Sequence, residues 1–205
     1  MKTRNFLSAL LLALCLVTLS LNVHAQQADT PDETNLDTQL YLIVGTNQDV
    51  DDARLPASLE PVVRQLRATL PFKNYRLAAT LINRVKNEGK LDLSWVGGPL
   101  APMGASTAST PSFSTFRLRQ LKLVRTDEGQ VVQMLGFYFG ARIPIQVNSP
   151  VAATTGVPPV FNYEQTGVST DISMREGEPV IVGTLNVGPS GDAIILVVSA
   201  KRTPK

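Results

Sequence analysis

The stretch QLYLIVGT, residues 39–46, is apolar at nearly every position. An uninterrupted apolar run of this length is typical of a strand covered on both faces, because a strand with one wet face alternates instead. The stretch AIILVVSA, residues 193–200, has the same character. We therefore expect two fully buried strands, far apart in the chain, at the centre of a β-rich fold.

Residues 58–70 carry the pattern of one amphipathic helix. Apolar side chains recur at helical spacing and form a single stripe: Leu59, Val62, Val63, Leu66 and Leu70. Ser58 is the expected N-cap, Pro61 is tolerated in the first turn, and Pro71 ends the helix.

Most of the remaining chain is patterned as strands. Residues 75–86 fit a strand or a helix face, and we favour a strand because residues 87–90 resemble a hairpin turn into residues 91–95. Residues 116–125 change their apolar phase, which indicates a bulge near Gln120. From residue 131 to 147 we expect one apolar face that includes Val131, Leu135, Phe137 and Phe139.

Three turns share the dipeptide Glu-Gly, at residues 88–89, 128–129 and 176–177. Glycine takes a positive φ without strain, so we expect Gly89, Gly129 and Gly177 to do so in hairpins. The pattern as a whole predicts an α+β fold, mostly antiparallel β. A small βαββ lobe (39–96) precedes a flexible Gly/Ala/Ser/Pro loop (97–112) and a β-sandwich-like lobe (113–203), or 39–203 form one compact domain.

The first 25 residues have the features of a secretory signal peptide. Lys2 and Arg4 precede an apolar run, and Val23 and Ala25 are small residues before the expected cleavage site. Residues 26–38 are polar and acidic, and we expect a disordered leader there. No later stretch is long and apolar enough to span a membrane. We expect an exported bacterial protein, periplasmic or secreted.

Processing would leave a chain without histidine or cysteine. The single Cys15 and the single His24 both lie in the signal segment. This composition excludes Cys and His nucleophiles and Cys/His zinc sites from the mature chain. Lys2 and Arg4 are also removed, which leaves 17 basic and 17 acidic residues and argues against nucleic acid as a partner.

One strand is basic, with Arg117, Arg119, Lys122 and Arg125. It lies in a segment, residues 53–142, that carries 13 basic and 5 acidic residues. Charges of this kind are found on exposed sheet edges, and they are also able to dock an anionic partner. The four residues are our candidate binding site. The acidic loop 47–52 lacks the Gly and Glu positions of an EF-hand, so we favour a solvated loop over the alternative of a loose, weak calcium site, and we expect neither a metal nor another cofactor.

Residues 175–185, REGEPVIVGTL, followed by IILV at 194–197, resemble the closing β-hairpin of the secretin family of outer-membrane pore proteins. The resemblance covers residues 172–200 and consists of an acidic-Gly turn and two apolar strands. Thr184 replaces a second glycine, and residues 186–192 are short where secretins carry a long insertion. The resemblance implies a related β-module of the cell envelope, not a pore.

Together these patterns predict a non-enzymatic envelope protein that acts by binding or assembly. Its partner would be another envelope protein or an anionic surface. The alternative is an extracytoplasmic hydrolase that uses Asp and Glu carboxylates, since 17 acidic residues are present.

Overall fold

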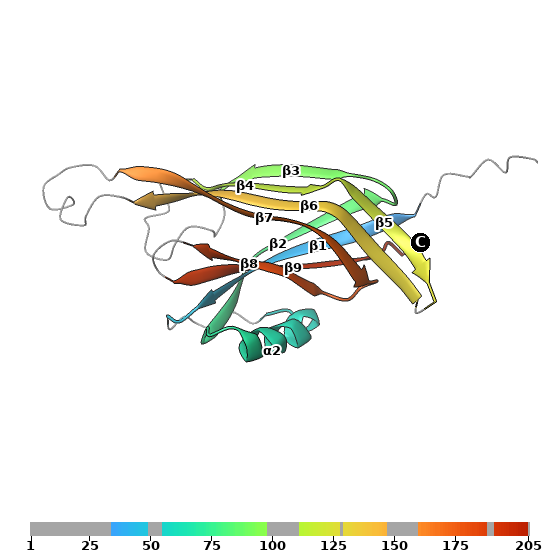
Figure 1. Ribbon diagram of the computed structural model, residues 1–205, viewed down its shortest axis with the longest axis horizontal. Helices are drawn as coiled ribbons and strands as arrows, with labels where there is room; N and C mark the ends of the chain where they lie inside the picture. Colours follow the sequence, from blue (N-terminus) through green and yellow to red (C-terminus); the bar gives the residue numbers. More distant parts are fainter. Residues whose placement is uncertain are drawn as a thin grey trace, which may run out of the picture. The chain divides into compact units, whose positions relative to one another are not determined.

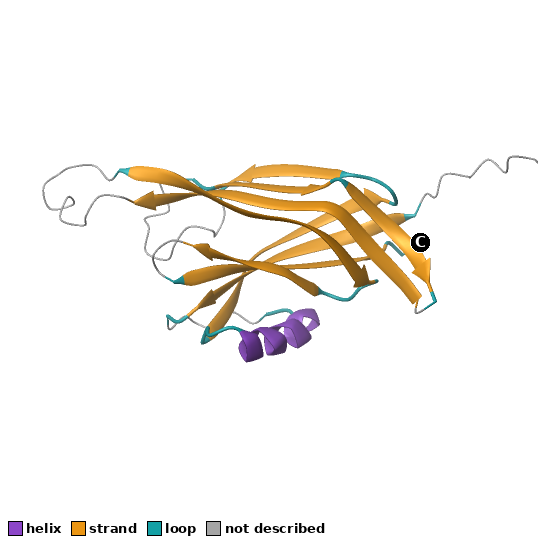
Figure 2. Ribbon diagram, in the orientation of Figure 1, coloured by secondary structure: helices purple, strands orange, loops and turns teal. Residues whose placement is uncertain are grey.

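The computed structural model describes residues 34–48, 55–97, 111–127, 129–146, 160–187 and 191–204. Within these ranges the fold is mostly antiparallel β with one short helix (Figures 1 and 2), as the sequence predicts. The signal peptide, residues 26–33 of the acidic leader, most of the loop 97–112 and residues 49–52 of the acidic loop lie outside the described residues. Residues 35–38 of the leader, expected to be disordered, belong to the first strand instead.

The strands form two antiparallel sheets. Sheet A has the order β2-β1-β9-β8, and sheet B has the order β3-β4-β6-β5 with β7 on the other side of β6. The bounds are β1 Asn35–Thr46, β2 Asn74–Lys86, β3 Leu91–Val96, β4 Phe113–Leu118, β5 Gln120–Thr126, β6 Gly129–Gln146, β7 Phe161–Arg175, β8 Val180–Val187 and β9 Asp192–Arg202. Residues 75–86 are therefore a strand, as favoured above.

β1 and β9 are the two buried strands that the sequence predicts. They pair with each other in the middle of sheet A, from Leu36↔Arg202 to Gly45↔Ala193. One face of the pair contributes Leu40, Leu42 and Leu196 to the core between the sheets. The opposite face contributes Ile43 and Val197 to a second core beneath the helix. Both faces of each strand are therefore buried in a hydrophobic core.

The helix covers the outer side of sheet A (Figure 1). A 3-10 turn, η2 (Ala57–Leu59), leads into α2 (Glu60–Thr69). The predicted stripe is confirmed: Leu59, Val62, Val63 and Leu66 are buried, and Leu70 packs beside them. The buried Tyr75 hydroxyl donates a hydrogen bond to the Leu66 carbonyl at 3.1 Å.

The predicted cap is wrong. Leu59 is the N-cap residue, and no side chain caps the helix. The chain enters through the 3-10 turn instead, in which the Leu59 N–H donates to the Pro56 carbonyl at 2.9 Å. Pro61 also brings no N–H to the first turn, so fewer donors need a cap.

The predicted hairpin at residues 87–90 is also wrong. β2 pairs with β1 in sheet A, whereas β3 pairs with β4 in sheet B, so this turn crosses between the sheets. Its backbone bonds both sides: the Asn87 N–H donates to Thr34 O at 2.8 Å and the Glu88 N–H donates to Leu121 O at 2.7 Å. Residues 87–90 therefore form a corner turn, which connects β2 of sheet A to β3 of sheet B.

A second corner turn, residues 175–178, joins β7 in sheet B to β8 in sheet A. The Glu176 N–H donates to Gln130 O at 3.2 Å, and the Gly177 N–H donates to Ala200 O at 2.7 Å. This turn is therefore hydrogen-bonded to a strand of each sheet. Of the three Glu-Gly turns expected in hairpins, the one that ends at Gly129 lies between two strands that pair with each other, since β5 pairs with β6 up to Thr126↔Gly129. The hairpin expected at residues 176–177 is wrong, because β7 and β8 lie in different sheets.

Positive φ angles occur at Gly129 (127°) and Gly177 (81°), as predicted, but not at Gly89. In that turn Glu88 has the φ of 63°. The Gly89 N–H donates to Lys86 O at 2.8 Å, which makes Glu88 the third residue of a β-turn, the position that has a positive φ in type II and type I′ turns. Gly89 is needed for space, because a Cβ there would lie 2.7 Å from the same oxygen.

The change of apolar phase expected near Gln120 is present, but no residue is inserted against β6, because the register is the same on both sides, from Arg117↔Tyr138 to Gln120↔Leu135. β6 changes phase at the same place, which was not expected, and we call this paired irregularity at Arg119 and Gly136 the double bulge. β4 ends at Leu118 and β5 begins at Gln120, with Arg119 between them. Opposite lies Gly136 of β6, with a φ of 61°, and the apolar phase of β6 changes there. Val132 and Met134 are buried, so the prediction that Val131 and Leu135 share the core face with Phe137 is wrong.

Candidate functional site: the outer face of sheet B

The basic strand lies on β4 and β5, whose alternation decides where each charge points. Phe116 and Leu118 of β4 are buried in the core, so Arg117 and Arg119 lie on the outer face of sheet B. After the bulge the phase changes: Leu121 is buried and Lys122 lies on the outer face. Arg125 follows the phase of Leu121 and is exposed at the end of β5. Three of the four predicted residues therefore share one face.

Two of the four have ion-pair partners. Arg117 Nε contacts the Asp92 carboxylate at 3.0 Å across β3 and β4, and Lys122 Nζ contacts Glu88 at 3.7 Å. Within the described residues, no carboxylate lies within 4.0 Å of the Arg119 or Arg125 side chains. Both pairs are well exposed, so each holds its charge in place weakly.

The basic strand is an edge only in its second half. β4 lies between β3 and β6, whereas β5 pairs with β6 alone among the described strands. The corner turn at residues 87–90 covers the start of the β5 edge. The Leu121 N–H donates to Gly89 O at 2.9 Å, and the Leu123 N–H donates to Asn87 Oδ1 at 2.8 Å. Little of β5 is left to pair with an added strand.

The opposite end of the same face carries a group of side chains that sequence reasoning missed. Phe113 of β4 and Tyr163 of β7 lie with ring centroids 5.7 Å apart, and the Arg142 guanidinium of β6 lies 5.5 Å from the Tyr163 ring. Val96 of β3 is opposite Phe113 in the register. We call these four residues the aromatic–arginine cluster.

The members of the cluster are far apart in the sequence, and no motif or regular spacing relates them. Phe113, Arg142 and Tyr163 come from three strands, and only the register brings them together: Phe113 is opposite Arg142 on β6, and Tyr163 is opposite Pro144 on the same strand. The alternation of β4 does place Phe113 on the same face as Arg117, which is the one signal that the sequence contains.

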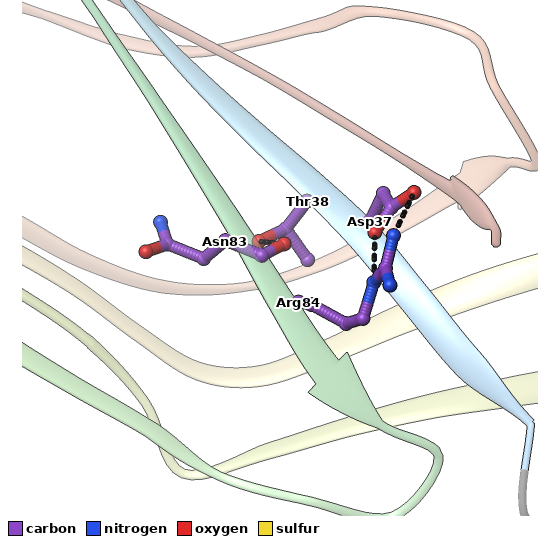
Figure 3. A network of polar contacts seen from close by, with 4 residues as sticks. All are labelled: Asp37, Thr38, Asn83 and Arg84. Carbon is purple, nitrogen blue, oxygen red and sulfur yellow. Dashed lines mark hydrogen bonds and ion pairs between the residues drawn. The ribbon is translucent and has the colours of Figure 1, made fainter.

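A separate polar network joins β1 and β2 of sheet A (Figure 3). Arg84 Nε donates to Asp37 Oδ1 at 2.8 Å, and the neighbouring Thr38 hydroxyl donates to the Asn83 carbonyl at 3.2 Å. The hydrogen bond from Arg84 lowers the pKa of Asp37 below its usual value and outweighs the opposing effect of burial. These residues hold β1 to β2.

The corner turn at residues 175–178 contains a second carboxylate with a shifted pKa. Glu176 Oε1 accepts hydrogen bonds from the backbone N–H and from Nε of Arg202, each at 2.9 Å. Burial alone would raise the pKa of Glu176, but the hydrogen bonds from Arg202 reverse this and lower it. Both shifts are opposite to the raised pKa that a general acid requires.

The described residues contain no group of three or more His, Cys, Asp or Glu side chains placed to hold a metal ion. None of their helices is both long and apolar enough to cross a bilayer.

No family model matches the chain, and no curated protein matches it in sequence. Solved structures of secretins do match. The secretin InvG of the Salmonella SPI-1 type III secretion injectisome matches at 10% identity with a TM-score of 0.37, over 84% of this chain and 65% of that chain. Its open-gate structure matches at 10% identity and a TM-score of 0.38, over 100% of this chain and 66% of that one.

The type IV competence pilus secretin PilQ of V. cholerae matches at 11% identity with a TM-score of 0.31, over 84% of this chain and 58% of that chain. The chain thus spans less than two thirds of each of these secretin chains. These matches are a weak and partial likeness to secretin domains, the family that residues 172–200 resemble.

Proposed function

We propose that the protein is exported, to the periplasm or beyond, and acts in the cell envelope by binding or assembling with another envelope component. The signal-peptide pattern of residues 1–25 supports export. A mature chain without His or Cys supports a role other than catalysis, because it lacks the side chains that most often serve as nucleophile or base.

The observation that carries the proposal is the outer face of sheet B. Arg117, Arg119 and Lys122 lie on it, together with the aromatic–arginine cluster. These candidate side chains are spread over one face of the sheet and do not converge on one point. An open, charged face with exposed aromatic side chains suits recognition of a surface, since aromatic residues and Arg are the side chains enriched at interfaces.

The alternative, a hydrolase, requires a carboxylic acid with a raised pKa beside a second carboxylate. Of the carboxylates in the described ranges, Asp37 and Glu176 have clearly shifted pKa values, and each is shifted down by an arginine. Each of the two carboxylates forms an ion pair with an arginine, Asp37 with Arg84 and Glu176 with Arg202. They therefore give the hydrolase proposal no support.

The test is capture of envelope components by the immobilised protein. Arg119→Glu should reduce capture severalfold, because it reverses a cation without a nearby carboxylate, and 0.5 M salt, about a 4 Å Debye length, should do the same. Arg64→Glu is the matched control: Arg64 is an exposed arginine on α2, which covers sheet A. Equal capture by both variants at all salt concentrations would refute the proposed face.

A further inference from the structure

We propose that the outer face of sheet B docks on an anionic lipid surface, with the aromatic–arginine cluster as its point of insertion. This inference rests on the proposed function and names the partner class. Three observations carry it: the placement of the cluster across the sheet, the charge of the face around it, and the exposure of its apolar side chains.

The cluster is a row of four side chains from four neighbouring strands. Val96 lies on β3, Phe113 on β4, Arg142 on β6 and Tyr163 on β7, and these strands are adjacent in that order. The row therefore extends across the width of the sheet at one end. A row of this kind presents a flat front to a partner and does not enclose a small ligand.

Arg142 is held in place but remains exposed. Its guanidinium stacks 5.5 Å from the Tyr163 ring, and that ring is fixed in turn by a hydrogen bond from its hydroxyl to the Pro111 carbonyl at 3.0 Å. No carboxylate among the described residues lies within 4.0 Å of the Arg142 side chain. A guanidinium held in this way, without a carboxylate beside it among the described residues, matches the two oxygens of a phosphate.

The rest of the face is basic. Among the described residues the face carries five cations against three carboxylates; the cations are Arg117, Arg119, Lys122, Arg142 and Arg175, and the carboxylates are Asp92, Asp171 and Glu88, which contacts Lys122. Such a surplus attracts a surface of opposite charge, and the attraction weakens as salt screens it.

The apolar members of the cluster distinguish a lipid surface from an acidic protein or polymer. Val96 is 63% exposed, Phe113 40% and Tyr163 37%, at the same end of the face. Large apolar side chains beside cations are the composition with which proteins bind the headgroup region, where the rings enter the acyl boundary and the cations meet phosphate. A purely acidic polymer would pair with the cations but leave these side chains in water.

The experiment measures flotation of the purified protein with vesicles. One set contains phosphatidylglycerol and phosphatidylcholine, and the other contains phosphatidylcholine alone. We expect binding to the anionic vesicles, at least about tenfold stronger than to the neutral ones. Arg142→Glu should reduce that binding about tenfold, because it exchanges a cation for an anion at the surface. Phe113→Ser should reduce it severalfold without a change in charge.

Two controls keep the result interpretable. Arg64→Glu should bind as the unchanged protein does, because α2 lies on the outer side of sheet A. The fluorescence of Trp95, the single tryptophan, reports folding of each variant, since its side chain packs towards the core between the sheets.

Absence of binding to anionic vesicles overturns the proposal, and so does binding that Arg142→Glu leaves unchanged. Equal affinity for soluble polyaspartate, together with no effect of Phe113→Ser, would identify a partner recognised by charge alone and also overturn it. Retained capture of envelope proteins in either case would leave the proposed function standing, whereas loss of both activities would remove both proposals.

Discussion

Gly136 occupies the most demanding backbone position in sheet B. Its φ is 61°, and a Cβ there would lie 2.8 Å from Arg119 Cβ, across the double bulge. Gly177 also has a positive φ, 81°, but a Cβ there would meet nothing within 4 Å. An added side chain would therefore meet only backbone strain at Gly177, but both strain and steric crowding at Gly136.

We expect Gly177→Ala to cost about 1 kcal/mol of unfolding free energy, from strain alone. Gly136→Ala should cost more, about 2–3 kcal/mol, because the added methyl also displaces Arg119. Urea denaturation of both variants measures the difference. Equal losses would show that the bulge yields freely to the extra atom.

Single residues of the candidate site were predictable in part. Alternation gives the exposed positions of Arg117 and Arg119, because buried Phe116 and Leu118 fix the phase of β4. The sequence contains no comparable signal for Arg142 and Tyr163, since their contact depends on the register of β6 with β7. Contacts across a sheet are set by pairing between distant segments, which a local pattern does not encode.

At the scale of single elements, α2 depends on its apolar stripe. Leu66 is 2% exposed and packs in the core beneath the helix, and its carbonyl accepts the Tyr75 hydroxyl. Leu66→Ala should lower the unfolding free energy by about 2–5 kcal/mol, because it removes buried methyl groups and leaves a cavity.

Arg64→Ala, on the exposed side of the same helix, should change the unfolding free energy by less than about 0.5 kcal/mol. Chemical denaturation of the two variants measures both values. A Leu66→Ala loss no larger than that of Arg64→Ala would mean that the helix does not pack on sheet A in solution.

The two sides of the double bulge were not equally predictable. Along β4 and β5 the apolar residues change phase visibly, from Leu118 to Leu121, so the sequence indicates the bulge. Along β6 both Val131 and Val132 are apolar, and so are Met134 and Leu135. Either phase then satisfies the pattern, and the partner strand decides which one is buried.

At the scale of the whole molecule, the corner turns join the two sheets. Glu176 connects the corner turn at residues 175–178 to β9 through its hydrogen bonds with Arg202. Its pKa is lowered in the folded state by the hydrogen bonds from Arg202. A lowered pKa means that ionised Glu176 stabilises the fold above its unfolded pKa, near 4.3, and that this contribution is lost as pH falls through the folded value.

We therefore expect Glu176→Gln to reduce the urea midpoint at pH 7 and to have a smaller effect at pH 3, where the carboxyl of the unchanged protein is being protonated. Asp92→Asn serves as control, because Asp92 and its partner Arg117 are both well exposed and contribute little at either pH. A Glu176→Gln effect that is the same at both pH values would contradict the assigned role of the carboxylate.

The sheet topology was the least predictable feature at this scale. Residues 87–90 and 175–178 have the local chemistry of hairpin turns, yet both cross between sheets. A turn fixes the direction of the chain over a few residues, whereas the choice of partner is made by the strands. β2 pairs along its length with the apolar β1 and stands at the edge of sheet A, whereas β3 pairs with β4 in sheet B.

The pairing of β1 with β9 has a consequence for the order of events during synthesis. β1 is the first described strand to leave the ribosome and β9 is the last, and each is the other's neighbour along ten residue pairs. Until β9 has emerged, β1 exposes an unpaired apolar edge, the kind of surface on which nascent chains aggregate. Sheet A is thus completed only after translation has passed residue 202. A chain that is held unfolded until then does not expose this edge to aggregation.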